Sequence, residues 1–474
     1  MGRRQKERGR RGAAAEEGGS GEGASGGIRE KLERWLPVGL VTGLLLLAAA
    51  LWHVHEETAR KDGFSVLLTG DTAGCFLPLG SPGTRLGGLP RRAGLAAKLR
   101  ESGPLLALDA GGAVSGNLPY DRIEMEHIFR AEALLGIAAH NLGAPEVALE
   151  AGTLRTLDHD IGIPFVSANA QATEMPPFSQ RRILLRIAGC DVGITGITTA
   201  PAGGPVRGVE VRDARSALRE LLPGLRHECE VLVVLAYVDL PQLLALAAEF
   251  PQVDLFLGGP TGHPYPPALH GRTVVAAATD QGRRAVVLRV KPPAEPGGPV
   301  RWTGALRDLV EGLPEPEPVL QLVDGYRKVL AAKDMEPGET PFMPRLRAIP
   351  GLFVAGSDRC IPCHSEAAAA WLASRHSEAG GALARDGLVN DPQCLRCHST
   401  CYGYPGGFAR PSASSTLRAV GCESCHGPSA SHAEQPTRHT PWDARTTCIS
   451  CHDADNSPRF ELESYQARIE HRRR

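Results

Sequence analysis

The sequence predicts a multidomain protein with an N-terminal transmembrane helix, an α/β domain in the middle, and a C-terminal domain of short helices and irregular chain. Three observations predict this order. An uncharged apolar stretch covers residues 36–52. Apolar runs then alternate with helical patterns across residues 63–303, which is typical of an α/β domain. Finally, a short cysteine and histidine motif is repeated four times within residues 353–474.

Residues 1–35 are basic and rich in glycine and alanine, so we expect a disordered cytoplasmic tail that buries no core. As a helix, residues 36–52 would span roughly 25 Å, just enough to cross a bilayer with short flanks. Basic residues crowd the N-terminal side of this stretch, including Arg29 and Arg34. The positive-inside rule therefore places everything after Trp52 outside the cytoplasm.

A cleaved signal peptide is the alternative to this anchor, with Ala48 to Ala50 as a possible cleavage site. The long basic region before the apolar stretch favours the uncleaved anchor. Both interpretations export the rest of the chain. The prediction is a single-pass protein of the cytoplasmic (inner) membrane, with its C-terminal domain facing the periplasm or the cell exterior.

The net charge and the cysteine content indicate which classes of function the sequence supports. The net charge is −1, so a nucleic-acid partner has no electrostatic support and none is expected. Twelve cysteines are present, and eight belong to the repeated motif. The other four are scattered, and we interpret them as buried thiols: Cys75, Cys190, Cys229 and Cys401.

In the middle domain, residues 63–303, apolar runs predict buried strands. These are Ser65–Thr69, Pro104–Leu108, Val192–Gly196 and Val231–Leu235. Between them, helices are predicted at Arg91–Arg100, Ile123–Leu135 and Leu240–Glu249. A segment rich in proline and glycine, residues 291–299, is predicted to end the domain. Residues 304–352 then form a helix, from 316 to 333, and a proline-bearing linker.

The repeated motif is Cys-x-x-Cys-His. Its members are Cys360, Cys363 and His364; Cys394, Cys397 and His398; Cys422, Cys425 and His426; and Cys448, Cys451 and His452. This spacing attaches a c-type haem, because both thiols bond to the haem vinyl groups and the adjacent histidine ligates the iron. Zinc sites would need only two Cys-x-x-Cys pairs each and no histidine after every pair. The sequence therefore predicts four covalently attached c-type haems with these four histidines as proximal ligands.

The C-terminal domain, residues 353–474, offers few residues per haem, so we expect the haems to form its core. Four further histidines lie there: His376, His432, His439 and His471. Histidine is the usual sixth ligand of an electron-transfer haem. Four extra histidines for four haems suggest distal ligands, although some could be surface residues of a polar segment.

This domain resembles the tetrahaem cytochrome c family whose known member carries electrons away from hydroxylamine oxidoreductase. The matching residues are Trp371–His376, Asp391–His398, Gly403–Phe408, Cys422–Pro428, His432, Asn456–Pro458, Tyr465 and His471. The resemblance implies distal ligands at His376, His432 and His471, and supports His439 less. It also implies one haem without a protein sixth ligand, by analogy that of His398.

Cys401 stands where this family commonly has glycine. We interpret it as a small residue packed against haem. A weak axial thiolate and a partner for another thiol are the alternatives.

The middle domain resembles the calcineurin-like metallophosphoesterases of the bacterial 5′-nucleotidase type, which implies an α/β metallophosphoesterase-like sandwich. The similar segments are Thr69–Gly74, Leu86–Arg92, Asp109–Gly112, Asn141–Gly143, Pro164–Asn169 and Leu257–Gly262. That family uses two metal ions to activate water and hold phosphate.

Nearly all the metal ligands of that family are replaced here. The positions that differ are Ala73, Gly112, Gly143 to Glu146, Ala236 with Tyr237, and Gly259 to Gly262. Only Asp71 remains as a plausible ligand, so a two-metal centre and catalytic residues are not expected. His140 and His263 lie near the lost motifs, and we interpret both as solvated loop histidines rather than replacement ligands.

These observations favour a membrane-anchored, extracytoplasmic tetrahaem cytochrome that transfers electrons between a redox protein donor and an acceptor. The phosphoesterase-like domain would be an inactive spacer or docking module. One alternative is an oxidoreductase acting on a small nitrogen or sulfur compound at an open haem. The other is a 5′-nucleotidase-like metallophosphoesterase that carries haems.

Overall fold

The protein is described from a computed structural model, which defines residues 41, 44–49, 51–52, 62–80, 83–295, 297–438 and 442–471. It forms two compact units, residues 1–58 and 59–474. The predicted tail, residues 1–35, lies outside the described residues, as does much of the predicted spanning helix, residues 36–52. The described part of that stretch is helical. Within the described ranges, we find no helix with both the length and the apolar character needed to cross a bilayer.

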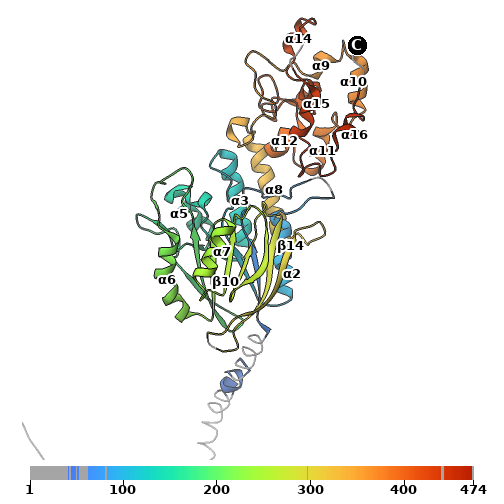
Figure 1. The fold of residues 1–474 in the computed structure, drawn as a ribbon. Helices are drawn as coiled ribbons and strands as arrows, with labels where there is room; N and C mark the ends of the chain where they lie inside the picture. Colours follow the sequence, from blue (N-terminus) through green and yellow to red (C-terminus); the bar gives the residue numbers. More distant parts are fainter. Residues whose placement is uncertain are drawn as a thin grey trace, which may run out of the picture. The chain divides into compact units, whose positions relative to one another are not determined.

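The middle domain contains two six-stranded sheets (Figure 1). The first has the order β14-β13-β1-β2-β3-β4, with bounds Arg301–Asp308, Arg284–Lys291, Phe64–Thr69, Leu105–Asp109, Ile137–Asn141 and Phe165–Val166. The second has the order β11-β12-β10-β9-β7-β6, with bounds Tyr265–His270, Thr273–Ala277, Leu255–Gly259, Val231–Tyr237, Cys190–Thr198 and Ile183–Ile187. A small pair joins β5, Ala170–Ala172, to β8, Val209–Val211.

The two sheets pack face to face through one apolar core. Alternating residues of β1, such as Val66 and Leu68, join Val192 of β7 and Val233 of β9 in this core. Helices cover the outer faces: α2 (Leu89–Glu101), α3 (Pro119–Leu135), α4 (Ala144–Val147) and α5 (Glu150–Ile161) on the first sheet, and α6 (Ala214–Glu228) and α7 (Leu240–Glu249) on the second. The predicted α/β domain, with the strands and helices expected from its apolar patterns, is confirmed.

Parallel pairing brings the carboxyl ends of several strands to one edge. β1 pairs in parallel with β2, and β2 with β3, so that Thr69 lies beside Asp109, and Asp109 beside His140. In the second sheet β9 and β10 also pair in parallel, and Tyr237 lies beside Gly259. The loops after these strands form the edge where ligands bind in folds of this type.

The fold of the middle domain continues past the predicted boundary at residue 303. That boundary falls inside β14, which pairs with β13 over its full length. The segment rich in proline and glycine is the connection between these two strands. The next helix, α8 (Glu317–Lys333), packs its apolar face into the same core as α3, through residues such as Val323 and Leu330.

The C-terminal domain is built from short helical segments. They are α9 (Ser357–Cys360), α10 (Ser365–Leu372), α11 (Ala379–Asp386), α12 (Pro392–His398), α13 (Cys422–His426), α14 (Ala430–Glu434), α15 (Ala444–Thr447) and α16 (Leu462–Gln466). Short 3-10 turns, η1 (Pro337–Glu339), η2 (Ser415–Leu417) and η3 (Cys448–Ser450), lie before and between them. The described residues from 353 onward contain no β-strand, and their apolar clusters are small. This is the architecture expected where prosthetic groups supply the core.

A substitution at Leu330 can test whether α8 is an integral part of the middle domain. Its side chain is 1% exposed in the core shared with α3. We expect Leu330→Ala to lower the free energy of unfolding by about 2–5 kcal/mol, because it leaves a cavity. Hydrogen exchange of α3 and α8 measures this loss. Lys328→Ala, on the exposed face of α8, is the control; an equal loss of protection in both variants would contradict a buried role for α8.

Candidate haem sites and the altered phosphoesterase cleft

Each of the four Cys-x-x-Cys-His motifs lies on or next to a helical turn. The second and third are inside α12 and α13, the first begins at the end of α9, and the fourth begins in η3. In the first and fourth, the backbone amide of the histidine donates to the carbonyl of the first cysteine, at 3.0 Å for His364 and 2.9 Å for His452. All twelve cysteines are among the described residues, and none of them is in a disulfide. The eight motif thiols are therefore available for covalent attachment.

Three of the motif histidines each lie opposite a second histidine. The ring centroids are 6.0 Å apart for His364 and His432, 6.1 Å for His376 and His452, and 5.6 Å for His426 and His471. A metal–imidazole bond is about 2.0–2.1 Å long, and the ring centre lies roughly 1.1 Å beyond the nitrogen. Two imidazoles bound on opposite sides of one metal ion therefore have their ring centroids about 6 Å apart. The spacing of all three pairs thus fits a haem iron between the rings.

Hydrogen bonds orient several of these rings. The Nδ1 atom lies 2.8 Å from the Arg438 carbonyl in His432, 3.0 Å from the Ile469 carbonyl in His471, and 3.1 Å from the Ala379 carbonyl in His398. An Nδ1–H that donates to a carbonyl fixes the tautomer in which Nε2 carries the lone pair for a metal.

His398 differs from the other motif histidines. Among the described residues it has no partner imidazole at a comparable distance. His439, the fourth extra histidine, lies outside the described residues. His398 does lie near the pair formed by His376 and His452. Burial lowers the pKa of His376, and the neighbouring rings of His452 and His398 lower it further.

The cysteines also show which motifs are neighbours. The thiols of Cys360 and Cys422, in the first and third motifs, are in hydrogen-bond contact. The thiols of Cys397 and Cys451, in the second and fourth motifs, are in contact as well. These contacts place the first motif beside the third and the second beside the fourth.

Cys401 adopts φ 51°, in the left-handed region that favours glycine. Its side chain is buried in a small cluster with Leu346, Val354 and Tyr404. Burial raises the pKa of the thiol to about 12. A protonated thiol packed among apolar side chains fits a space-filling residue better than a thiolate ligand.

In the middle domain, the ring of Tyr237 lies against Gly112. A Cβ atom built on Gly112 would lie 2.5 Å from Cε2 of Tyr237, so the ring fills the space that a larger side chain would need there. The Tyr237 hydroxyl donates to Asp71 at 3.5 Å, and Thr279 donates to the same carboxylate. The Asp71 carboxylate is thus bound by two side-chain hydroxyls.

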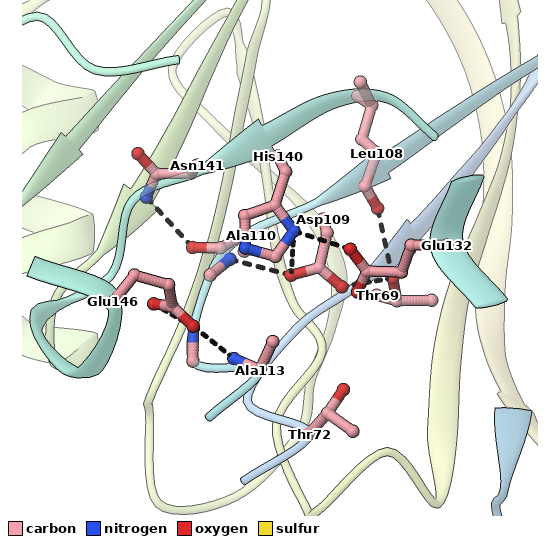
Figure 2. Close-up of polar contacts among 12 residues, drawn as sticks. Thr69, Thr72, Leu108, Asp109, Ala110, Ala113, Glu132, His140, Asn141 and Glu146 are labelled. Atoms are coloured by element: carbon pink, nitrogen blue, oxygen red, sulfur yellow. Dashed lines mark hydrogen bonds and ion pairs between the residues drawn. The ribbon is translucent and has the colours of Figure 1, made fainter. Parts of the chain in front are cut away.

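Glu146 fills the neighbouring turn (Figure 2). Its carboxylate accepts hydrogen bonds from the backbone amides of Gly112 at 3.0 Å, Ala113 at 2.6 Å and Val114 at 3.3 Å. These amides satisfy the carboxylate without a metal ion.

The interpretation of His140 as a solvated loop histidine is wrong. His140 is 0% exposed and lies in β3, and its Nδ1 is 2.8 Å from Oε2 of Glu132 and 3.8 Å from Oδ1 of Asp109 (Figure 2). Burial opposes a charge on the ring, but the two carboxylates outweigh it and raise the pKa of His140 to about 9. His263, in contrast, is exposed in a loop as expected.

The ligand atoms of Asp109, Glu132 and His140 lie within 4.8 Å of one another, which is close enough for a metal ion. The same side chains form a buried ion-pair network, in which His140 faces Glu132 and Arg92 lies 3.7 Å from Asp109. Sequence analysis missed Glu132, whose one signal was its position on the buried face of α3, four residues after Ile128.

Comparisons with known proteins agree with both resemblances. Residues 359–427 match the family model described as cytochrome c554 and c-prime. Cytochrome c-554 of Nitrosomonas europaea is 33% identical over 89 residues, which are 15% of this chain and 37% of that protein. The chain thus spans well under half of this curated relative.

Two solved structures of hydrolases are similar to this chain in fold. One is the sulfate thiohydrolase SoxB of Thermus thermophilus, with a TM-score of 0.50 and 17% identity over 60% of this chain and 62% of that chain. Another is a 5′-nucleotidase precursor from the same species, with a TM-score of 0.50 and 22% identity over 58% of this chain and 60% of that chain. These likenesses show the fold alone.

This chain therefore combines a segment, residues 359–427, that is similar to the cytochrome c554 and c-prime family with an α/β domain of phosphoesterase-like fold.

The raised pKa of His140 predicts that the free energy of unfolding depends on pH. A folded-state pKa of about 9, above the unfolded value of 6.5, adds stability that is complete below pH 6.5 and is lost as the pH rises through 9. We expect His140→Gln to cost roughly 3 kcal/mol at pH 6 and much less at pH 9.5, because the imidazolium is then gone. Denaturant unfolding at the two pH values measures both. The exposed His263→Gln is the control, and a cost for His140→Gln that is the same at both pH values would contradict the ion pair.

Proposed function

We propose that this chain is a tetrahaem c-type cytochrome that passes electrons between a redox protein donor and an acceptor. The observation that carries the proposal is the set of three histidine pairs with ring centroids 5.6–6.1 Å apart, each including one motif histidine. The four motifs supply the attachment thiols: Cys360, Cys363, Cys394, Cys397, Cys422, Cys425, Cys448 and Cys451. The proximal ligands are His364, His398, His426 and His452, and the distal ligands are His376, His432 and His471.

Bound c-type haem supplies reversible one-electron chemistry at its iron. The protein contributes the axial imidazoles, and the hydrogen bonds at Nδ1 hold those rings in place. The contacts between the first and third motifs, and between the second and fourth, support close haem spacing. Short distances between neighbouring haems are what a chain of single-electron steps requires.

The second candidate is an oxidoreductase acting on a small nitrogen or sulfur compound. The observation that favours it is His398, which has no partner imidazole among the described residues. An iron held by His398 alone has one coordination position for a small molecule. His439 is the protein residue that would close this position.

The phosphoesterase-like domain is proposed to be inactive as a hydrolase. The ring of Tyr237 over Gly112 and the carboxylate of Glu146 in the adjacent turn support this, because they fill the space that two metal ions need. The domain then acts as a spacer or docking module.

The apolar residues 36–52 are proposed to anchor the chain in the cytoplasmic membrane, with the haems on the periplasmic or outer side.

His376→Ala tests the assignment of ligands. We expect the haem attached to Cys448 and Cys451 to change from low-spin to high-spin, because His452 loses its partner ring, with the other haems unchanged. Electron paramagnetic resonance counts the two spin states, and potentiometric titration follows the electrons taken up. His263→Ala is the control; an unchanged low-spin count in His376→Ala would contradict the assignment.

Hydrolysis can be tested directly on the full-length protein. With Mn²⁺ added, we expect no release of phosphate from 5′-nucleotides above that of buffer. Asp71→Ala is the matched variant, since Asp71 is the remaining plausible ligand. Phosphate release that disappears in Asp71→Ala would establish the 5′-nucleotidase-like function instead.

A further inference from the structure

A buried cluster of tyrosine and carboxyl groups joins the phosphoesterase-like domain to the helix that carries the second haem motif. The Tyr120 hydroxyl of α3 donates to Oδ1 of Asp391 at 3.0 Å, and lies 3.1 Å from the hydroxyl of Tyr326 in α8. Tyr120, Asp391 and Tyr326 are 0%, 4% and 1% exposed, respectively. A buried polar cluster of this kind lowers the stability of the fold unless each polar group in it has a hydrogen-bond partner.

Asp391 is the N-cap of α12. Its Oδ1 atom also accepts the backbone amide of Gln393 at 2.9 Å, which is the usual capping bond. The helix that begins there contains Cys394, Cys397 and His398. Burial raises the pKa of the Cys394 thiol, and the charge of Asp391 raises it further, so Asp391 lies within electrostatic range of a haem attachment point.

The surroundings of Asp391 contain few compensating charges. From α3 it faces Tyr120 and Glu124, and Glu124 is 5% exposed. From α8 it faces Tyr326 and Arg327, and from α12 the Cys394 thiol. Arg327 is the cation among them, and its guanidinium also binds the Asp386 carbonyl at 3.0 Å and the Asp324 carboxylate at 3.4 Å.

Burial raises the pKa of Asp391 to about 6, while the bonds from Gln393 and Tyr120 lower it. Burial and the nearby Asp391 raise the pKa of Glu124 well above its usual range. The charge of Asp391 itself changes close to neutral pH.

The phosphoesterase-like domain also contacts the helix that orients His398. The Nδ1 of His398 meets the Ala379 carbonyl of α11. The last residue of α11, Asp386, pairs with Arg85 at 2.6 Å. Both helices around His398 are thus held by side chains of the middle domain.

We propose that Asp391, held by Tyr120, takes up a proton when the haem bound by His398 is reduced, so that the phosphoesterase-like domain couples electron transfer at this haem to proton uptake. This rests on the proposed haem at His398. One electron from a one-electron reductant reaches the iron, and one proton from solvent converts the Asp391 carboxylate to a carboxylic acid. The local net charge is then unchanged.

The physical reason is charge repulsion in a poorly solvated interior. An added electron near Cys394 disfavours the nearby carboxylate, because like charges raise the pKa of an acid. Conversely, the ionised carboxylate disfavours the electron. The potential of this haem should therefore fall as the pH rises above about 6, where Asp391 is ionised in the oxidised protein.

The test is a redox titration of each haem in the full-length haem-loaded protein between pH 5 and pH 9, with dithionite as reductant. We expect the potential of the His398 haem to fall with pH, and Asp391→Asn to remove this slope. Asparagine caps a helix as well as aspartate does, so α12 should keep its start. Glu126→Gln, at an exposed carboxylate of α3 outside the cluster, is the control and should keep the slope.

Tyr120→Phe separates proton coupling from a purely structural role. The tyrosine hydrogen bond lowers the pKa of Asp391, so its loss should move the onset of the slope to higher pH without removing it. A flat wild-type profile, an unchanged slope in Asp391→Asn, or an unmoved onset in Tyr120→Phe would overturn the proposal. A protein that lacks its haems or takes up no electrons would instead contradict the proposed function.

Discussion

Two imidazole rings that ligate one iron lie about 6 Å apart, and three pairs of histidines in the C-terminal domain have this spacing. Segments distant in the sequence meet in these pairs, such as His376 with His452 at 6.1 Å. Between the pairs the chain forms short helices with little apolar core of its own. On the proposed assignment, thioether-bound haem would replace the side-chain packing that stabilises an ordinary domain of this size.

Protein groups fill the loops at one edge of the phosphoesterase-like domain. The ring of Tyr237 lies against Gly112, and Glu146 binds the backbone amides beside it. Beneath this edge, His140 and Arg92 balance Glu132 and Asp109. The same domain makes a buried contact with α12 through Tyr120. On the proposal above, this contact gives the domain a role at the second Cys-x-x-Cys-His motif.

Much of this could be predicted from the sequence, since the strongest signals are local. The four haem motifs have fixed spacing, and apolar runs located β1, β2, β7 and β9. The pairing of histidines could not be derived from spacing, because it depends on how loops return across the domain; the family resemblance supplied the distal candidates. His140 was misjudged because its partner Glu132 lies in another element. The segment rich in proline and glycine suggested a domain boundary, whereas it is a loop between two paired strands.

The proposed ligand set gives three irons two histidine ligands each and, among the described residues, leaves His398 as the one protein ligand of the fourth. An electron paramagnetic resonance spectrum of the oxidised, full-length protein, paired with a haem count, tests it most directly. The account predicts four haems, three of them low-spin and one high-spin. Four low-spin irons would show that His398 has a partner, with His439 the residue to examine, and fewer than four haems would contradict the tetrahaem assignment.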